Sequence, residues 1–70
     1  MEETLRKLVN AQPWQPIEFE LSSGEWVRVE SPDLILVGFD AVEVLDLAAR
    51  QYRHFTMLHI REARHVNAAA

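Results

Sequence analysis

Residues 17–21 alternate strictly between apolar and acidic side chains, and this alternation is the strongest structural constraint in the chain. A period of two is typical of a strand with one buried face. Residues 22–24 carry the turn-forming serine and glycine, and residues 25–30 follow as a return strand. The two segments and the turn between them therefore predict a β-hairpin.

The loop length sets the register of this hairpin. A three-residue loop at 22–24 pairs Phe19 with Val27, so that the apolar side chains of both strands share one face. A two-residue loop would place Phe19 opposite Arg28. Since a slip of one residue turns every side chain to the other face, the longer loop is preferred. It also puts Gly24 at the left-handed position of a bulged hairpin loop.

The chain before the hairpin predicts a short helix over about residues 2–11. Three apolar side chains share one helical face there, namely Leu5, Leu8 and Val9. Pro13 ends the helix, because the residue before a proline favours extended backbone. We expect Trp14 to hold this helix against the sheet.

After the hairpin, further strands are expected at residues 34–37, 42–47, 52–56 and 60–66, with one 3₁₀ turn at 57–59. Proline is tolerated at a bend, so Pro32 is expected to join residues 25–30 and 34–37 into one long bent strand. This joining gives five strands. The alternative is a helix over residues 41–59. The aromatic and β-branched residues of this segment argue against a helix, because they favour strands.

The expected fold is mainly β, a short N-terminal helix with a five-stranded, strongly bent antiparallel barrel. One domain spans residues 1–70, with the barrel at about 17–66 and a frayed tail at 67–70. A core in a chain of 70 residues supplies little stability, and without cysteine no disulfide can add to it. Self-association is therefore the expected supplement.

The N-terminus and the hydropathy pattern bear on location. No apolar run approaches the roughly 20 residues of a membrane span. The acidic start of the chain lacks the basic and apolar regions of a signal peptide. We expect a cytoplasmic protein without a membrane partner.

Charge is unevenly distributed along the chain. The net charge is −4, yet all the acidic residues except Glu62 lie before residue 50, while four of the seven basic residues lie from residue 50 onward. Three histidines, His54, His59 and His65, share this basic segment. Such polarity suits binding of an anion or of the acidic face of another copy.

Catalytic and metal-binding patterns are weak. The three histidines lack the helical i, i+4 spacing of zinc enzymes, and no phosphate loop or dinucleotide motif occurs. Two carboxylate pairs, Glu18 with Glu20 and Glu43 with Asp46, are expected to be the polar sides of strands. We therefore expect no enzyme, no metal, no cofactor and no small-molecule substrate.

The order of helix, strand, bent strand, two strands, 3₁₀ turn and last strand resembles the Sm-like family, to which bacterial Hfq belongs. The resemblance covers roughly residues 2–66. The chain also looks like a group of small bacterial proteins with no assigned activity, through Pro13–Pro16 with its tryptophan, Ser23–Gly24, Pro32–Asp33 and Leu58–Ile60. The resemblance to the Sm-like family implies an SH3- or Sm-like barrel that forms rings by strand pairing between subunits.

We therefore expect a non-catalytic Sm-like module that forms a homo-oligomeric ring above dimer size and weakens in high salt. Its subunit interface is expected to bring an acidic patch at Glu43 and Asp46 against a basic strand pair. The expected contributors from that pair are Tyr52, His54 and Arg64.

Two other functions remain open. The resemblance implies RNA binding, with His59 matching the histidine of the Tyr-Lys-His segment of Hfq, and the basic residues Arg61 and Arg53 as further candidates. The other alternative is a monomeric SH3-like adaptor that binds a peptide through Trp14, Trp26 and Tyr52.

Overall fold

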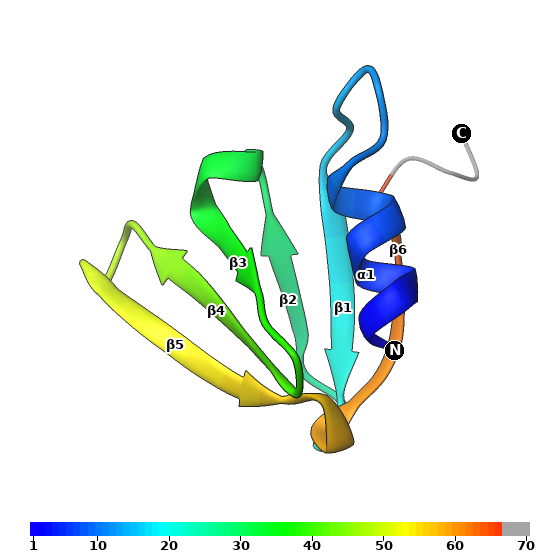
Figure 1. Cartoon of the computed structure of the whole chain (residues 1–70). Coiled ribbons are helices and arrows are strands. Elements are labelled where there is room, and N and C mark those ends of the chain that lie inside the picture. Colours follow the sequence, from blue (N-terminus) through cyan, green and yellow to red (C-terminus); the bar gives the residue numbers. More distant parts are fainter. Residues whose placement is uncertain (67–70) are drawn as a thin grey trace.

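One helix and six strands make up the part of the chain that the computed structural model describes, residues 1–66 (Figure 1). In chain order they are α1 (Glu2–Val9), β1 (Ile17–Leu21), β2 (Trp26–Val29), β3 (Ile35–Val37), β4 (Ala41–Asp46), β5 (Gln51–Thr56) and β6 (Ile60–His65). Two 3₁₀ turns accompany them, η1 (Pro32–Leu34) before β3 and η2 (Met57–His59) before β6. The mainly β class is confirmed.

The hairpin of β1 and β2 has the predicted register. Phe19 pairs with Val27, and Ile17 pairs with Val29. Gly24 has a φ of 94°, which is the left-handed backbone that the three-residue loop requires. Local alternation and turn chemistry therefore determine this part of the fold.

The strands form two antiparallel sheets of three strands, in the orders β2-β1-β6 and β3-β4-β5. The expected joining of residues 25–30 and 34–37 into one strand is wrong, because η1 separates β2 from β3. The Ser31 hydroxyl accepts a hydrogen bond from the Asp33 N–H at 3.3 Å, and Pro32 has no N–H to give to a ladder. Within residues 1–66 no ladder closes the two sheets into a barrel.

Residues 41–59 form the β4-β5 hairpin and η2, so the alternative of a helix there is wrong. Leu45 pairs with Tyr52, and the turn between the strands contains Arg50 at a φ of 55°. The helix α1 ends two residues earlier than the predicted boundary of 11, and β6 ends at His65. The predicted frayed tail, residues 67–70, lies outside the described residues.

The core lies between the two sheets and under α1. Phe19 of β1 and Phe55 of β5 meet edge to face, with ring centroids 5.5 Å apart. Leu5 of α1 is fully buried in the same core cluster. The Trp14 indole N–H donates to the Glu30 carbonyl at 3.0 Å, so Trp14 holds the connector after α1 against the end of β2.

None of the described residues belongs to a helix with the length and apolar character that a membrane crossing needs.

The Phe19–Phe55 contact should couple the two sheets energetically. We expect Phe19→Leu and Phe55→Leu each to lower the free energy of unfolding, and the double variant to lose less than the sum. An edge-to-face aromatic pair contributes about 0.5–1.5 kcal/mol beyond burial, so the coupling in a double-mutant cycle should fall in this range. Urea unfolding of the four proteins measures it, and strict additivity would contradict the contact.

Candidate assembly surface

Strands β5 and β6 each have a neighbour on one side only, β4 for β5 and β1 for β6. They lie at opposite sides of the strand array and are joined through η2 (Figure 1). Each strand has six residues. An unpaired edge presents a row of N–H and C=O groups that can pair with another strand.

The orientation of the β5 backbone follows from one hydrogen bond. The Met57 N–H donates to the Asp40 carbonyl at 2.7 Å, continuing the ladder with β4. Because peptide groups of successive residues point to opposite sides of a strand, those of Arg53 and Phe55, two and four residues before Met57, also face β4. The N–H and C=O groups of Tyr52 and His54 therefore point to the free edge.

The same reasoning orients β6. The Val66 N–H donates to the Pro16 carbonyl at 2.9 Å, so the peptide groups of Arg64 face β1 as well. Those of Ala63 and His65 then point to the free edge. Arg61 is the extra residue of a β-bulge, because Ile60 pairs with Leu21 while Glu62 pairs with Glu20.

Three of the residues expected at a subunit interface share one face of the β3-β4-β5 sheet. Glu43 of β4 pairs with His54 of β5, and Tyr52 is the neighbouring outward residue on β5. The Tyr52 side chain is 72% exposed. This is the face turned away from the core, since Val42 and Val44 on the other face of β4 are buried.

The other two expected interface residues lie elsewhere. Asp46 is three positions after Glu43, so it faces the opposite side of β4, and its carboxylate accepts the Ala49 N–H at 3.1 Å. The Arg64 guanidinium on β6 donates to the Glu18 carboxylate at 2.8 Å and lies 4.2 Å from the centre of the Trp26 ring. Glu43 and Asp46 therefore do not share one face of β4.

The RNA-binding candidates divide in a similar way. Arg53 makes two hydrogen bonds to the Glu25 carboxylate, at 2.9 and 3.1 Å, and lies 4.9 Å from the centre of the Phe55 ring. The backbone carbonyl of His59 accepts a hydrogen bond from the Ser22 N–H at 2.8 Å. The imidazole of His59 takes no part in this contact, and the residue is exposed. Arg61 is exposed, and among residues 1–66 it takes part in no ion pair.

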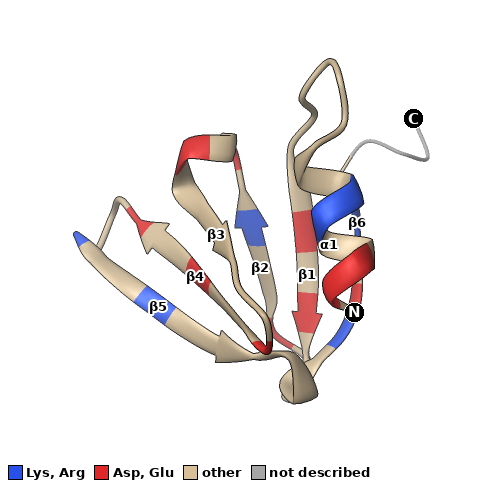
Figure 2. Ribbon diagram, viewed as in Figure 1, with Lys and Arg blue, Asp and Glu red and all other residues tan. Residues whose placement is uncertain are grey.

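The charge asymmetry of the sequence does not persist in space. Arg53 and Arg64 of the basic segment pair with Glu25 and Glu18 of the acidic part. Figure 2 shows acidic and basic positions interspersed over the strands. Basic residues of the last part of the sequence thus pair with acidic residues of its first half within one molecule.

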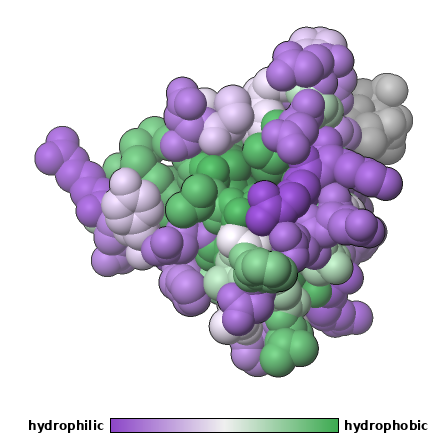
Figure 3. Space-filling model, in the orientation of Figure 1, coloured by the Kyte–Doolittle hydropathy of each residue, from purple (hydrophilic) through white to green (hydrophobic). Residues whose placement is uncertain are grey.

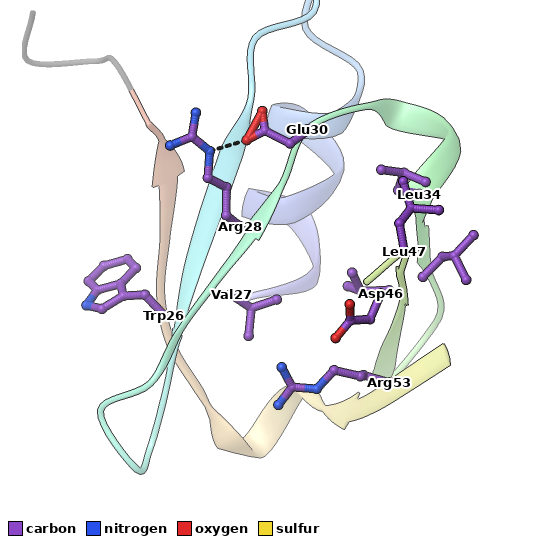
Figure 4. Close-up of a pocket in the computed structure, with 10 residues that line it drawn as sticks. Trp26, Val27, Arg28, Glu30, Leu34, Asp46, Leu47 and Arg53 are labelled. Atoms are coloured by element: carbon purple, nitrogen blue, oxygen red, sulfur yellow. Dashed lines mark ion pairs between the residues drawn. The ribbon is translucent and has the colours of Figure 1, made fainter. Parts of the chain in front are cut away.

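A hollow of about 300 Å³ lies between β2 and the ends of β4 and β5 (Figure 4). Trp26 and the ion-paired Arg28 and Glu30 line one side, and Asp46 and Arg53 line the other. Its charged groups are thus largely paired with one another or with neighbouring groups of the same chain. Within residues 1–66, no group of three His, Asp or Glu side chains is placed to hold a metal ion.

The three aromatic residues of the adaptor alternative do not converge. Trp26 lines the hollow between the sheets, and Tyr52 lines a second one of about 400 Å³ with Leu36 and Glu43. Trp14 packs against the core instead. A single aromatic groove is therefore not formed by these residues.

Several large apolar side chains are exposed, and sequence reasoning did not single them out. Leu36 is 66% exposed on β3, while Phe39 and Leu58, at turns, are 90% and 92% exposed. Figure 3 shows apolar side chains at the surface in the middle of this view and at the end where η2 lies. For Leu36, the available signal is the unbroken apolar run of residues 34–37, which predicts a strand buried on both faces. This prediction is wrong, because Leu36 is exposed.

Comparison of the chain with models of known families, with curated proteins and with solved structures finds no match.

The Glu25–Arg53 pair should make stability depend on pH. The hydrogen bonds and charge of Arg53 hold the pKa of the Glu25 carboxyl below its ordinary value of 4.5. A depressed folded-state pKa contributes stability that is present above the unfolded pKa and lost as the pH falls through the folded one. Glu25→Gln should therefore lower the free energy of unfolding at pH 7, and the difference from wild type should shrink below pH 4.5.

Urea unfolding at pH 7 and at a pH below 4.5 measures this difference. Glu3→Gln is the matched control, because Glu3 is exposed and forms none of the ion pairs found in residues 1–66. A difference for Glu25→Gln that stays constant with pH would contradict the pairing.

Proposed function

We propose that the chain is a non-catalytic Sm-like module that assembles into a homo-oligomeric ring. In this assembly the free edge of β5 in one copy pairs with the free edge of β6 in the next. The observation that carries the proposal is the pair of unpaired six-residue edges on one small domain. A contact between two different patches is heterologous, and repeated contacts close into a ring when the rotation allows it.

The order of elements supports the Sm-like assignment within this proposal. A short helix precedes the β1-β2 hairpin, and a 3₁₀ turn, η2, joins the last two strands. The order differs at Pro32, where η1 separates β2 from β3 and the resemblance implies one bent strand. The remaining elements follow the order on which the resemblance rests.

Side chains at both edges also support edge pairing. Phe55 on β5 and Ala63 on β6 are half-buried and pack against the core. Pairing of the two edges would bring such inward side chains of neighbouring copies together and bury them further. Additional burial matters here, because a domain of this size buries a small share of its surface alone.

The structure changes the expected role of charge in this contact. Arg53 and Arg64 are each already paired with a carboxylate of their own chain. Backbone hydrogen bonds and apolar burial are then the main contributors, and both respond weakly to salt. The proposed ring should accordingly dissociate little when the ionic strength rises.

Ala63→Pro should disrupt assembly while leaving the fold intact. The Ala63 N–H points away from β1, so a proline there removes a donor from the free edge without breaking the β1-β6 ladder. We expect wild type to form particles of more than two chains and the variant to form particles of two chains or one. Sedimentation velocity measures the masses, and circular dichroism checks the fold.

Ala48→Pro, in the exposed turn between β4 and β5, is the control and should keep the wild-type mass. A wild-type protein that sediments as one chain, or an Ala63→Pro variant with unchanged mass, contradicts the edge-paired ring.

RNA binding is the second candidate, supported by two exposed residues near the start of β6. His59 and Arg61 take part in none of the ion pairs found in residues 1–66. If they bind single strands, a labelled uridine-rich oligomer should bind at low salt, and Arg61→Ala should weaken it. Fluorescence anisotropy measures this, with Arg50→Ala as the matched control. Absence of binding by wild type at low salt excludes the candidate.

A further inference from the structure

The free edge of β2 borders the hollow between the two sheets. Three of the four residues of β2, Trp26, Val27 and Arg28, line this hollow of about 300 Å³. In the part of the chain that the structure describes, β2 pairs with β1 alone, so its other side has no strand beside it. A backbone edge and a concave space thus meet at one place on the surface.

One hydrogen bond orients the peptide groups of β2. The Leu21 N–H donates to the Glu25 carbonyl at 2.8 Å, so the Glu25 carbonyl faces β1. Because peptide groups of successive residues alternate, those of Val27 also face β1, while those of Trp26 and Arg28 face the free side. Each of these two residues therefore presents one N–H donor and one C=O acceptor along the edge.

Apolar side chains from both sheets line this hollow. Val27 of β2 and Val44 of β4 are buried, Leu34 is half-buried, and Leu47 is 63% exposed at the rim. Figure 4 shows Val27 and Leu34 across the space from each other. A volume of about 300 Å³ lies at the lower end of the range for ligand sites, so the hollow suits an apolar side chain and is too small for a folded domain.

The charged groups of the hollow already have partners in the chain. Arg28 pairs with Glu30, Arg53 pairs with Glu25, and the Asp46 carboxylate accepts a backbone N–H of the turn that follows. A charged side chain that entered the hollow would lose its hydration and find no free counter-charge. The side chain that fits this space is therefore uncharged.

We infer that β2 binds an extended peptide segment as an added antiparallel strand, with one uncharged apolar side chain in the hollow. Residues directly opposite each other on neighbouring strands point to the same face, so the peptide residue opposite Val27 directs its side chain inward. The two residues beside it lie opposite Trp26 and Arg28 and exchange backbone hydrogen bonds with them. The recognised segment is thus an apolar anchor between two residues with outward side chains.

The backbone groups specify this class of partner. A strand edge is complemented by the main chain of another extended segment, and a hollow beside the edge selects one of its side chains. Antiparallel addition continues the β2-β1-β6 sheet, in which both pairings are antiparallel. The inference goes beyond the proposed ring and does not depend on it, because the ring uses the edges of β5 and β6.

NMR titration of the full wild-type chain with the synthetic peptide Thr-Ser-Thr-Leu-Thr-Ser-Thr tests the inference. We expect the amide signals of Trp26 and Arg28 to shift, and their hydrogen exchange to slow at saturation. Replacing the leucine of the peptide by aspartate should raise the dissociation constant about tenfold or more, because the hollow offers a charge no partner.

Backbone methylation of the peptide tests the alignment. Methyl groups on the nitrogens of the two threonines beside the leucine should abolish binding, because these N–H groups donate to the carbonyls of Trp26 and Arg28. Methylation of the leucine nitrogen is the matched control. It should leave the dissociation constant within about twofold, because that N–H points away from β2.

Two pairs of variants locate the site on the protein. Arg28→Pro removes an edge donor without breaking the ladder with β1 and should weaken binding about tenfold, whereas Arg28→Ala keeps the N–H and should not. Leu47→Asp at the rim should also weaken binding. Its control is Leu36→Asp, which changes a leucine of similar exposure, 66%, outside the hollow. Circular dichroism checks the fold, and the methylated peptides give the answer if Arg28→Pro does not fold.

Absence of any shift at Trp26 and Arg28 with millimolar peptide would overturn the inference. Equal losses from the two kinds of methylation, equal effects of Leu47→Asp and Leu36→Asp, or shifts confined to β5 and β6 would do the same. Self-association of the wild-type chain that Arg28→Pro abolishes would make a second copy the occupant, which also contradicts it. A chain that sediments alone and yet binds the peptide at β2 would refute the ring and support this inference.

Discussion

The contact of Phe19 with Phe55 is the interaction on which the arrangement of the two sheets depends. Within residues 1–66 no ladder joins the sheets, so their relative position rests on side-chain packing and on the connecting turns. The two rings meet edge to face at 5.5 Å, and Leu5 of α1 is buried in the same cluster. A small core that is shared by two sheets and a helix gives each of its members a large effect on stability.

The division into two sheets leaves unpaired strand edges. Within residues 1–66 each sheet has two edge strands, β2 and β6 in one and β3 and β5 in the other, and β5 and β6 are the longer two. Soluble proteins usually shield such edges. Here neither edge carries a proline within its strand, and peptide groups of Tyr52, His54, Ala63 and His65 are directed outward. These outward groups are the ones that the proposed edge pairing would use.

Electrostatic interactions in this fold act mainly within the chain. Arg53 with Glu25, and Arg64 with Glu18, join residues that lie 28 and 46 positions apart. Both arginines also lie over aromatic rings, Arg53 over Phe55 and Arg64 over Trp26. A net acidic chain with a basic end can thus place its charges next to their opposites on folding.

Local patterns in the sequence determined the hairpin register, the left-handed Gly24, the short helix and the 3₁₀ turn before the last strand, because each depends on neighbours in the chain. Only the tertiary structure decided that Pro32 separates two strands, that Asp46 faces away from Glu43, and that Arg64 binds Glu18. It likewise decided that Leu36 is exposed. These outcomes depend on which distant segments pack together. An apolar run has the same sequence pattern whether one face of the strand or both faces are covered.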